Sequence, residues 1–329
     1  MNLTRALIIA LLLGTFCVAA PRCLAQEDEI VANLAGGRVI ILVARDTIIF
    51  GAIDHPIEAT GVPPRVTALG PSHIGILFGA SEWQIPAQPR PIRLDREVPE
   101  IVPPPKNVYR PPDSGEPDLE AIGVAYLEKL RPLVSQLHHK IELKPDDPLF
   151  EIVLIGYPHE YGPEVWLLEY NVEQKLVGGN NEYWETHILR PRFTQLYPPE
   201  KHQAKTIVET LFPANQQDVP LMGLLQANEP RVAQIRNSDA KFGKVAELLE
   251  RGQSTKANPD DAANFLRALL PVLAGKAEFI QGKMEETGGF EWIVPPAEPI
   301  EKPSQKDQDK DRPPDAPTLR RKADPNKPN

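Results

Sequence analysis

Hydrophobic positions follow a strand period in the first part of the chain. Apolar residues are nearly continuous over Val39–Ala44 and Thr47–Ile53, on both sides of a short polar turn. Such runs are typical of a hairpin whose strands are covered on both faces. Two further strands are predicted at Arg65–Leu69 and His73–Phe78, separated by a Gly-Pro turn.

The period changes to that of a helix after the next, proline-rich stretch. Asp118 is placed to cap a helix whose apolar residues recur three and four positions apart as far as Leu137. Pro132 should bend this helix or mark a break in it. The strand period then returns at Phe150–Ile155 and Glu164–Tyr170, which are joined by a stretch of turn residues.

The last elements return to helices before a final strand. Tyr183–Leu189 should extend the sheet of the preceding hairpin, and residues 219–251 and 260–281 are predicted to be helical. Phe290–Val294 is a closing strand, which follows a glycine pair. Because strands and helices occur in separate blocks, we expect an α+β fold rather than a doubly wound parallel sheet.

The first 25 residues have the pattern of a secretory signal peptide, with Arg5, the apolar run Ala6–Leu13 and small residues ending at Ala25. We expect cleavage after Ala25 and a secreted or periplasmic protein. No other stretch approaches the ~18 apolar residues of a membrane span, so we expect no membrane partner after cleavage. Lipid attachment at Cys23 is the alternative for this segment.

Removal of this leader changes the chemistry that the chain can offer. Cys17 and Cys23 are the two cysteines, so the mature chain would contain no disulfide, thiol nucleophile or zinc–thiolate site. Loss of the leader's two arginines takes the formal net charge from −9 to −11. An acidic chain argues against nucleic acid as a partner.

Prolines divide the rest of the chain. There are 37 in 329 residues, about twice the usual ~5%. We expect residues 86–118 to be an extended, proline-rich insertion over the surface, because their prolines interrupt any helical or strand period. Residues 297–329 are almost free of apolar side chains and are predicted to be a disordered tail. The folded domain should therefore span residues 26–296.

Several stretches resemble the proteasome β-subunit branch of the N-terminal-nucleophile (Ntn) hydrolases. RVIILVARDTIIFGAID is similar to the opening hairpin, and GVPPRVTALGPSHIGILFGASEW is similar to the next strand pair with its small-residue turn into a helix. FEIVLIGYPHEYGPEVWLLEY resembles the middle hairpin, and DDAANFLRALLPVLA followed by GGFEWIVPP resembles the late helix and closing strand. The resemblance covers most of residues 36–296, except the proline-rich insertion. It implies a four-layer αββα sandwich, in which helices flank two packed antiparallel sheets.

In that family the nucleophile is a Thr, Ser or Cys at the first residue of the opening strand, where its own α-amine is the base. This position falls at Gly37 or Arg38, and residues 26–46 contain no Ser, Thr or Cys. The resemblance therefore implies a degenerate site that lacks its nucleophile.

The supporting positions of the family's site also differ. The lysine position falls on Arg65, whose guanidinium cannot share a proton near neutral pH. The acidic position falls on Ile53 or Asp54, so that an Asp54–Arg65 ion pair is expected if Asp54 points inward. Ser81 belongs to a small-residue turn that would border the family's peptide-binding cleft. Solvation of Arg65 at the strand end is the alternative for that residue.

Other chemistry is weakly indicated. His138 and His139 are adjacent on one helix and belong to no recognised metal-ligand pattern on one face. His55 follows a strand end and the pair His159-Glu160 lies in a turn, and either could join a metal site assembled in space, with solvent exposure as the alternative. We predict neither a metal nor a cofactor, because there is no HExxH, P-loop or GxSxG pattern. The four tryptophans, at positions 83, 166, 184 and 292, lie in or beside predicted strands and are expected to pack in the core or on a sheet face, with a carbohydrate-binding face as the alternative.

These observations predict an exported, non-catalytic protein that acts as a binding or assembly component. A peptide or protein is the expected partner, and the resemblance implies self-association through helices. One alternative is an active amide or peptide hydrolase that uses Ser81, Ser72 or Thr67, or a water held by histidine and carboxylate groups. The other is an exported domain unrelated to this fold.

Overall fold

The computed structural model describes most strands and helices of the chain, over residues 30–54, 64–69, 73–86, 88–98, 119–141, 143, 147–157, 162–179, 182–198, 207–212, 219–286 and 289–296. The chain divides into two compact units, Met1–Pro295 and Pro296–Asn329. All the elements below belong to the first unit. The expected leader at 1–25 and tail at 297–329 lie outside the described residues.

The larger sheet, sheet A, has seven strands. They are β1 (Val31–Ala35), β4 (Arg65–Ala68), β5 (His73–Gln84), β6 (Ile92–Arg93), β7 (Phe150–Gly156), β8 (Glu164–Tyr170) and β11 (Arg192–Tyr197). The order β1-β5-β7-β8-β11 forms the body of the sheet, and the short strands β4 and β6 also pair with β5. The long strand β5 is therefore the organising strand of sheet A.

The second sheet, sheet B, has five strands in the order β12-β2-β3-β13-β14. They are β2 (Gly37–Ala44), β3 (Thr47–Asp54), β12 (Ile207–Phe212), β13 (Phe279–Glu285) and β14 (Gly289–Val294). A separate two-stranded sheet consists of β9 (Val172–Val177) and β10 (Tyr183–Ile188). Every strand pair among the described residues is antiparallel.

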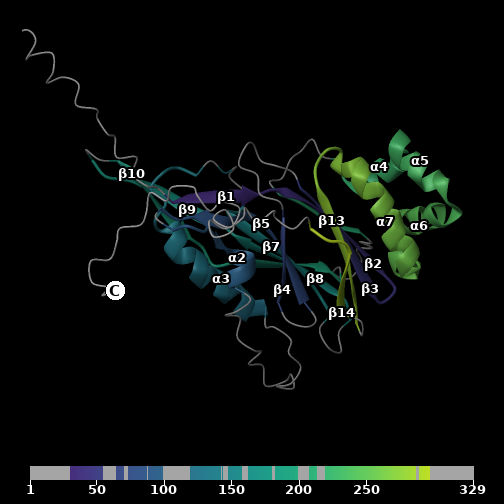
Figure 1. Ribbon diagram of the computed structural model, residues 1–329, viewed down its shortest axis with the longest axis horizontal. Helices are drawn as coiled ribbons and strands as arrows, with labels where there is room; N and C mark the ends of the chain where they lie inside the picture. The colour runs from purple at the N-terminus through teal and green to yellow at the C-terminus, as the bar shows by residue number, and fades with distance from the viewer. Residues whose placement is uncertain are drawn as a thin grey trace, which may run out of the picture. The chain divides into compact units, whose positions relative to one another are not determined.

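The helices fall into two groups. α2 and α3 lie between sheet A strands in the sequence, whereas α4 to α7 lie between β12 and β13. Their bounds are α2 (Leu94–Glu97), α3 (Leu119–Val134), α4 (Leu221–Gln226), α5 (Pro230–Ser238), α6 (Ala240–Glu250), a short 3₁₀ helix η2 (Ser254–Lys256) and α7 (Pro259–Ala274). Figure 1 shows α4 to α7 grouped together beside β2, β3 and β13.

Three hydrophobic clusters join these elements. One lies between the two sheets and includes Ile41 of β2, Phe50 of β3, Ile76 of β5 and Val153 of β7. A second joins the other face of sheet A to α2 and α3. The third joins the other face of sheet B to α4, α5, α6 and α7. Each sheet is therefore covered on both faces.

Burial on both faces explains the continuous apolar run that opens the domain. Because side chains alternate along a strand, Val39, Ile41 and Val43 of β2 enter the cluster between the sheets. Ile40 and Leu42, which point the other way, enter the cluster with the helices. Exposure of all five is at most 1%. A polar residue at any of these positions would be buried without a partner.

The α+β class predicted from the sequence is confirmed. The sheets are antiparallel, the helices occur in separate blocks, and the clusters are compatible with a sandwich. The opening hairpin, the middle hairpin, the first long helix and the closing strand lie where they were predicted. The four tryptophans lie in strands, as expected, at positions 83, 166, 184 and 292.

The predicted helix over 260–281 is too long. α7 begins after Asn258, whose Oδ1 accepts a hydrogen bond from the Asp261 N–H at 3.1 Å. It stops before Gly275, whose φ of +62° is one that glycine tolerates best. The next residues form strand β13, and residues 219–251 form three helices rather than one. Strands β1, β9, β11 and β12 were also not predicted.

The predicted turn at Gly79-Ala80-Ser81 is wrong. β5 continues through these residues to Gln84. Gly79 has a φ of +72° and lies so close to the Leu149 carbonyl that a Cβ would be 2.3 Å from its oxygen. Ala80 donates its N–H to the same oxygen at 2.9 Å. The small residues therefore allow close strand contact instead of reversing the chain.

The start of the proline-rich insertion contains secondary structure that was not predicted. Residues 92–97 form β6 and one turn of helix, α2. Leu94 and Val98 are fully buried in the cluster under α3. Apolar side chains between the prolines thus attach this part of residues 86–118 to the core. Residues 99–118 lie outside the described part of the chain.

Within the residues that the structure describes, no helix has both the length and the apolar character needed to cross a membrane.

Replacement of Phe50 by alanine tests the packing between the sheets. Its ring lies 6.1 Å from the rings of both Phe290 and Trp292, measured between centroids, and it is fully buried. Phe50→Ala should lower the free energy of unfolding by about 3–5 kcal/mol in urea denaturation. Val124→Ala changes a valine that is 48% exposed, and should stay within about 0.5 kcal/mol of wild type. Equal losses of unfolding free energy in the two variants would contradict this packing.

Candidate functional site

The predicted site lies where β2 begins. Gly37, the first residue of β2, pairs across the hairpin with Asp54, the last residue of β3. Pro64, which precedes Arg65 and β4, also touches this point, because a Cβ on Gly37 would be 2.8 Å from its Cγ. The structure therefore brings together the three chain segments that the resemblance places around the nucleophile.

This point has no room for a side chain. A Cβ on Gly37 would lie 2.4 Å from the Ile53 carbonyl oxygen and 3.0 Å from Cε1 of Phe78. The first of these contacts is with backbone, which cannot rotate away as a flexible side chain can. Glycine is therefore required at position 37 by packing.

Arg38, the other candidate for the nucleophile position, is held in a buried ion pair. Its guanidinium donates to Glu209 of β12 and, at 3.1 Å, to the Val219 carbonyl. The second oxygen of Glu209 accepts the N–H of Leu221, the first residue of α4, at 2.9 Å. The side chains of Arg38 and Glu209 are each 11% exposed. Arg38 thus fastens sheet B to the start of α4.

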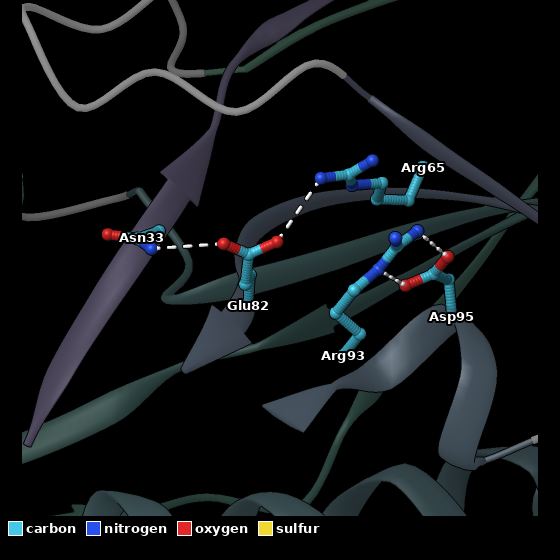
Figure 2. Close-up of polar contacts among 5 residues, drawn as sticks. All are labelled: Asn33, Arg65, Glu82, Arg93 and Asp95. Carbon is cyan, nitrogen blue, oxygen red and sulfur yellow. Dashed lines mark hydrogen bonds and ion pairs between the residues drawn. The ribbon is translucent and has the colours of Figure 1, made fainter. Parts of the chain in front are cut away.

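Arg65 forms an ion pair that the sequence did not suggest. It donates from Nη2 to Oε2 of Glu82 at 3.2 Å. Asn33 of β1 donates to the other oxygen of Glu82 at 3.1 Å. Figure 2 shows that these side chains come from three neighbouring strands, β4, β5 and β1. Sequence reasoning placed Arg65 correctly at a strand start but did not identify Glu82, because Glu82 lies on an extension of β5 that was not predicted.

A second pair lies beside this one. Arg93 makes two hydrogen bonds to Asp95, at 3.1 and 2.6 Å (Figure 2). Burial lowers the pKa of Arg65, and Arg93 lowers it further, whereas Asp95 and Glu82 act in the opposite direction. An arginine stays charged under such shifts. The carboxylate of Glu82 therefore stabilises the half-buried cation and links three strands.

The hydroxyl groups offered as alternative nucleophiles are not exposed. Ser81 is fully buried, and its Oγ has no hydrogen-bond partner among the described residues. Thr67 is 6% exposed and donates its hydroxyl to the Asp95 carbonyl at 2.7 Å. Ser72 lies outside the described residues. Neither Ser81 nor Thr67 is open to a substrate in this structure.

Histidines do not gather into a metal centre in the described residues, which contain no group of three or more His, Cys, Asp or Glu placed to hold a metal ion. His138 and His139 are exposed just after α3. His73 is buried, with its Nε2 3.2 Å from Oε1 of Glu164. His55, His159 and Glu160 lie outside the described residues.

Sequence reasoning missed a buried pair of carboxylates. Glu151 of β7 lies directly opposite Glu169 of β8, and the two residues are 6% and 9% exposed. Glu169 also lies opposite Arg192 of β11, which donates to both of its oxygens at 2.9 Å. Oε1 of Glu151 is buried and has no hydrogen-bond partner among the described residues. The signal in the sequence was one charged residue inside the apolar run FEIVLIG.

Burial, together with Glu169 and Asp147, raises the pKa of Glu151 to about 8. Two carboxylates on facing strands repel when both are ionised. The neutral form of Glu151 is therefore favoured near neutral pH.

No family model and no curated protein matches the chain.

The closed space at Gly37 can be tested by adding one methyl group. Gly37→Ala should lower the free energy of unfolding by about 1–3 kcal/mol, because the Ile53 carbonyl has to move. Gly179→Ala is the matched control, since a Cβ there meets nothing within 4 Å. Urea denaturation of both variants checks this. A Gly37→Ala variant as stable as the control would show that the space is open.

Glu151 should make stability depend on pH. Its pKa of about 8 in the fold lies above its ordinary value of 4.5, so its contribution is complete below pH 4.5 and is lost as the pH rises to 8. This contribution falls by up to about 1.4 kcal/mol per pH unit. In Glu151→Gln the difference from wild type should therefore grow in favour of the variant with rising pH. A difference independent of pH in denaturation experiments would contradict this.

Proposed function

We propose that the chain is an exported, degenerate relative of the Ntn hydrolases, with a four-layer αββα fold, that binds a peptide or protein partner without cleaving it. Support for the fold comes from two antiparallel sheets with a shared cluster and from helices on their other faces. The order of the hairpins in the sequence supports it too. The continuation of β5 to Gln84 departs from the family's pattern, in which a turn leads into a helix.

The single observation that carries the proposal is the closed space at Gly37. In the family that the sequence resembles, the attacking atom belongs to the side chain of this residue. Here a side chain would collide with the Ile53 carbonyl. A nucleophile also needs a base and open access to substrate, and the next residue, Arg38, is already held by Glu209.

The remaining charged groups of the site fit a structural role. Arg65 cannot act as a base and is paired with Glu82. The hydroxyl groups of Ser81 and Thr67 are buried. A rival amide hydrolase that used Ser81 or Thr67 would have to expose that hydroxyl group first. Self-association through helices stays a prediction of the resemblance, and export after cleavage at Ala25 stays a prediction from the leader sequence.

Chemical labelling together with a peptide-binding assay tests the proposal. The protein is incubated with a fluorophosphonate and with a peptide epoxyketone, and its intact mass is measured. A pool of fluorescent random-sequence peptides is tested in parallel for binding by anisotropy and for cleavage by mass spectrometry. We expect no adduct, no cleavage, and binding that heat denaturation abolishes.

Ser81→Ala and Thr67→Val are the matched variants for any reaction. An adduct lost in one of them, or peptide cleavage lost in one of them, would establish a hydrolase and overturn the proposal. Absence of both binding and cleavage would overturn the binding role.

A further inference from the structure

The buried carboxylates form a ladder that runs from the interior to the surface. Glu151, Glu169 and Arg192 occupy paired positions on β7, β8 and β11. The exposure of the side chain rises from Glu169 at 11% to Arg192 at 68%. Oε1 of Glu151, at the inner end, is buried without a hydrogen-bond partner among the described residues. Buried polar atoms without partners are uncommon in folded proteins.

The ladder contains one cation for two acids. Arg192 is bound to both oxygens of Glu169 and neutralises that carboxylate. The charged groups that act on Glu151 are Glu169 on β8 and Asp147 in the segment before β7, both acidic. Its partner on β5 is the apolar Phe78. While Glu151 holds a proton the ladder is neutral, and without that proton the ladder holds an uncompensated buried charge.

The inner end of the ladder is close to the candidate site. Phe78, the cross-strand neighbour of Glu151, lies 3.0 Å from the position of a Cβ on Gly37. Phe78 also stacks on Phe212 at 6.3 Å, and Phe212 is the β12 partner of Gly37. A shift of β7 relative to β8 would therefore also displace Phe78 and Phe212, the aromatic pair that packs against the start of β2.

We propose that Glu151, Glu169 and Arg192 form a proton-dependent latch that keeps this end of the sheets closed and opens it when Glu151 loses its proton. The unpaired buried charge then draws water between β7 and β8, because a buried ion without a counter-charge is strongly unfavourable. The latch rests on the proposed function in one respect: the end of the sheets that it opens is the candidate binding site.

Amide hydrogen exchange measured by mass spectrometry tests the latch. The exchange rates are measured at about two pH units below pH 8 and at about one unit above it. They are corrected for the change of the intrinsic exchange rate with pH. In the wild type, exchange in β7, β8 and β11 should be about tenfold faster at the higher pH, since one pH unit above the transition corresponds to a factor of ten. Exchange in α7, on the far side of sheet B, is the internal reference.

Three variants change the ratio of acids to arginine. Glu151→Gln and Glu169→Gln each leave one carboxylate for Arg192, so both should abolish the pH-dependent opening. Arg192→Gln removes the cation and should move the opening to lower pH. Glu173→Gln, which alters an exposed glutamate on β9, should behave as wild type. If Glu151→Gln does not fold, Glu169→Gln makes the same test.

The outcomes separate the latch from the proposed function. A wild type whose exchange in β7, β8 and β11 does not depend on pH overturns the latch alone, as does pH-dependent opening that persists in Glu169→Gln. Covalent labelling of Ser81 or Thr67 overturns the non-catalytic function and leaves the latch intact.

Discussion

The burial of the β2–β3 hairpin on both faces is the constraint on which the rest of the structure depends. One face packs against sheet A and the other against α4 to α7. Because both faces are closely packed, only glycine fits at the points where neighbouring elements come closest. At Gly51 a Cβ would lie 2.6 Å from Cδ2 of Leu270 on α7, and at Gly37 it would lie 2.4 Å from a backbone oxygen. The packing that stabilises the domain thus also leaves no room for a side chain at Gly37.

Charged residues around this hairpin serve to connect elements. Arg38 joins β2 to β12 and α4, and Glu82 joins β4 and β1 to β5. Replacing one residue of such an ion pair is costly, because the other residue is then left as an unpaired buried charge. They therefore restrict the register of the strands. The Glu151–Glu169 pair differs from them, since it contains two acids but one arginine, which is bound to Glu169.

The sequence predicted the parts of the fold whose signal is local. The apolar run from Val39 to Ala44 specified a strand covered on both faces, and Asn258 with Pro259 specified the start of α7. β13 was missed because Phe279, Ile280 and Met284 continue a helical spacing, and only Gly275 marks the break. β9 and β11 are half exposed, so their apolar residues are too few to show a strand period.

The sequence predicted which chain segments meet at the candidate site, but not which side chains form ion pairs there. The convergence of Gly37, Asp54 and the start of β4 follows from strand order, which the resemblance supplied. The pairing of Arg65 with Glu82 depends on strand pairing between β4, β5 and β1, which sequence spacing does not encode. Glu151 left a trace as a charge in an apolar run, but its relation to Glu169 requires the register of β7 and β8.

A crystal structure of the Gly37→Ala variant would test most directly whether a side chain can occupy the start of β2. The account predicts that the Ile53 carbonyl and the adjoining β2–β3 backbone move to relieve a contact that would otherwise be 2.4 Å. An unmoved backbone, with the added methyl group in open space, would contradict it.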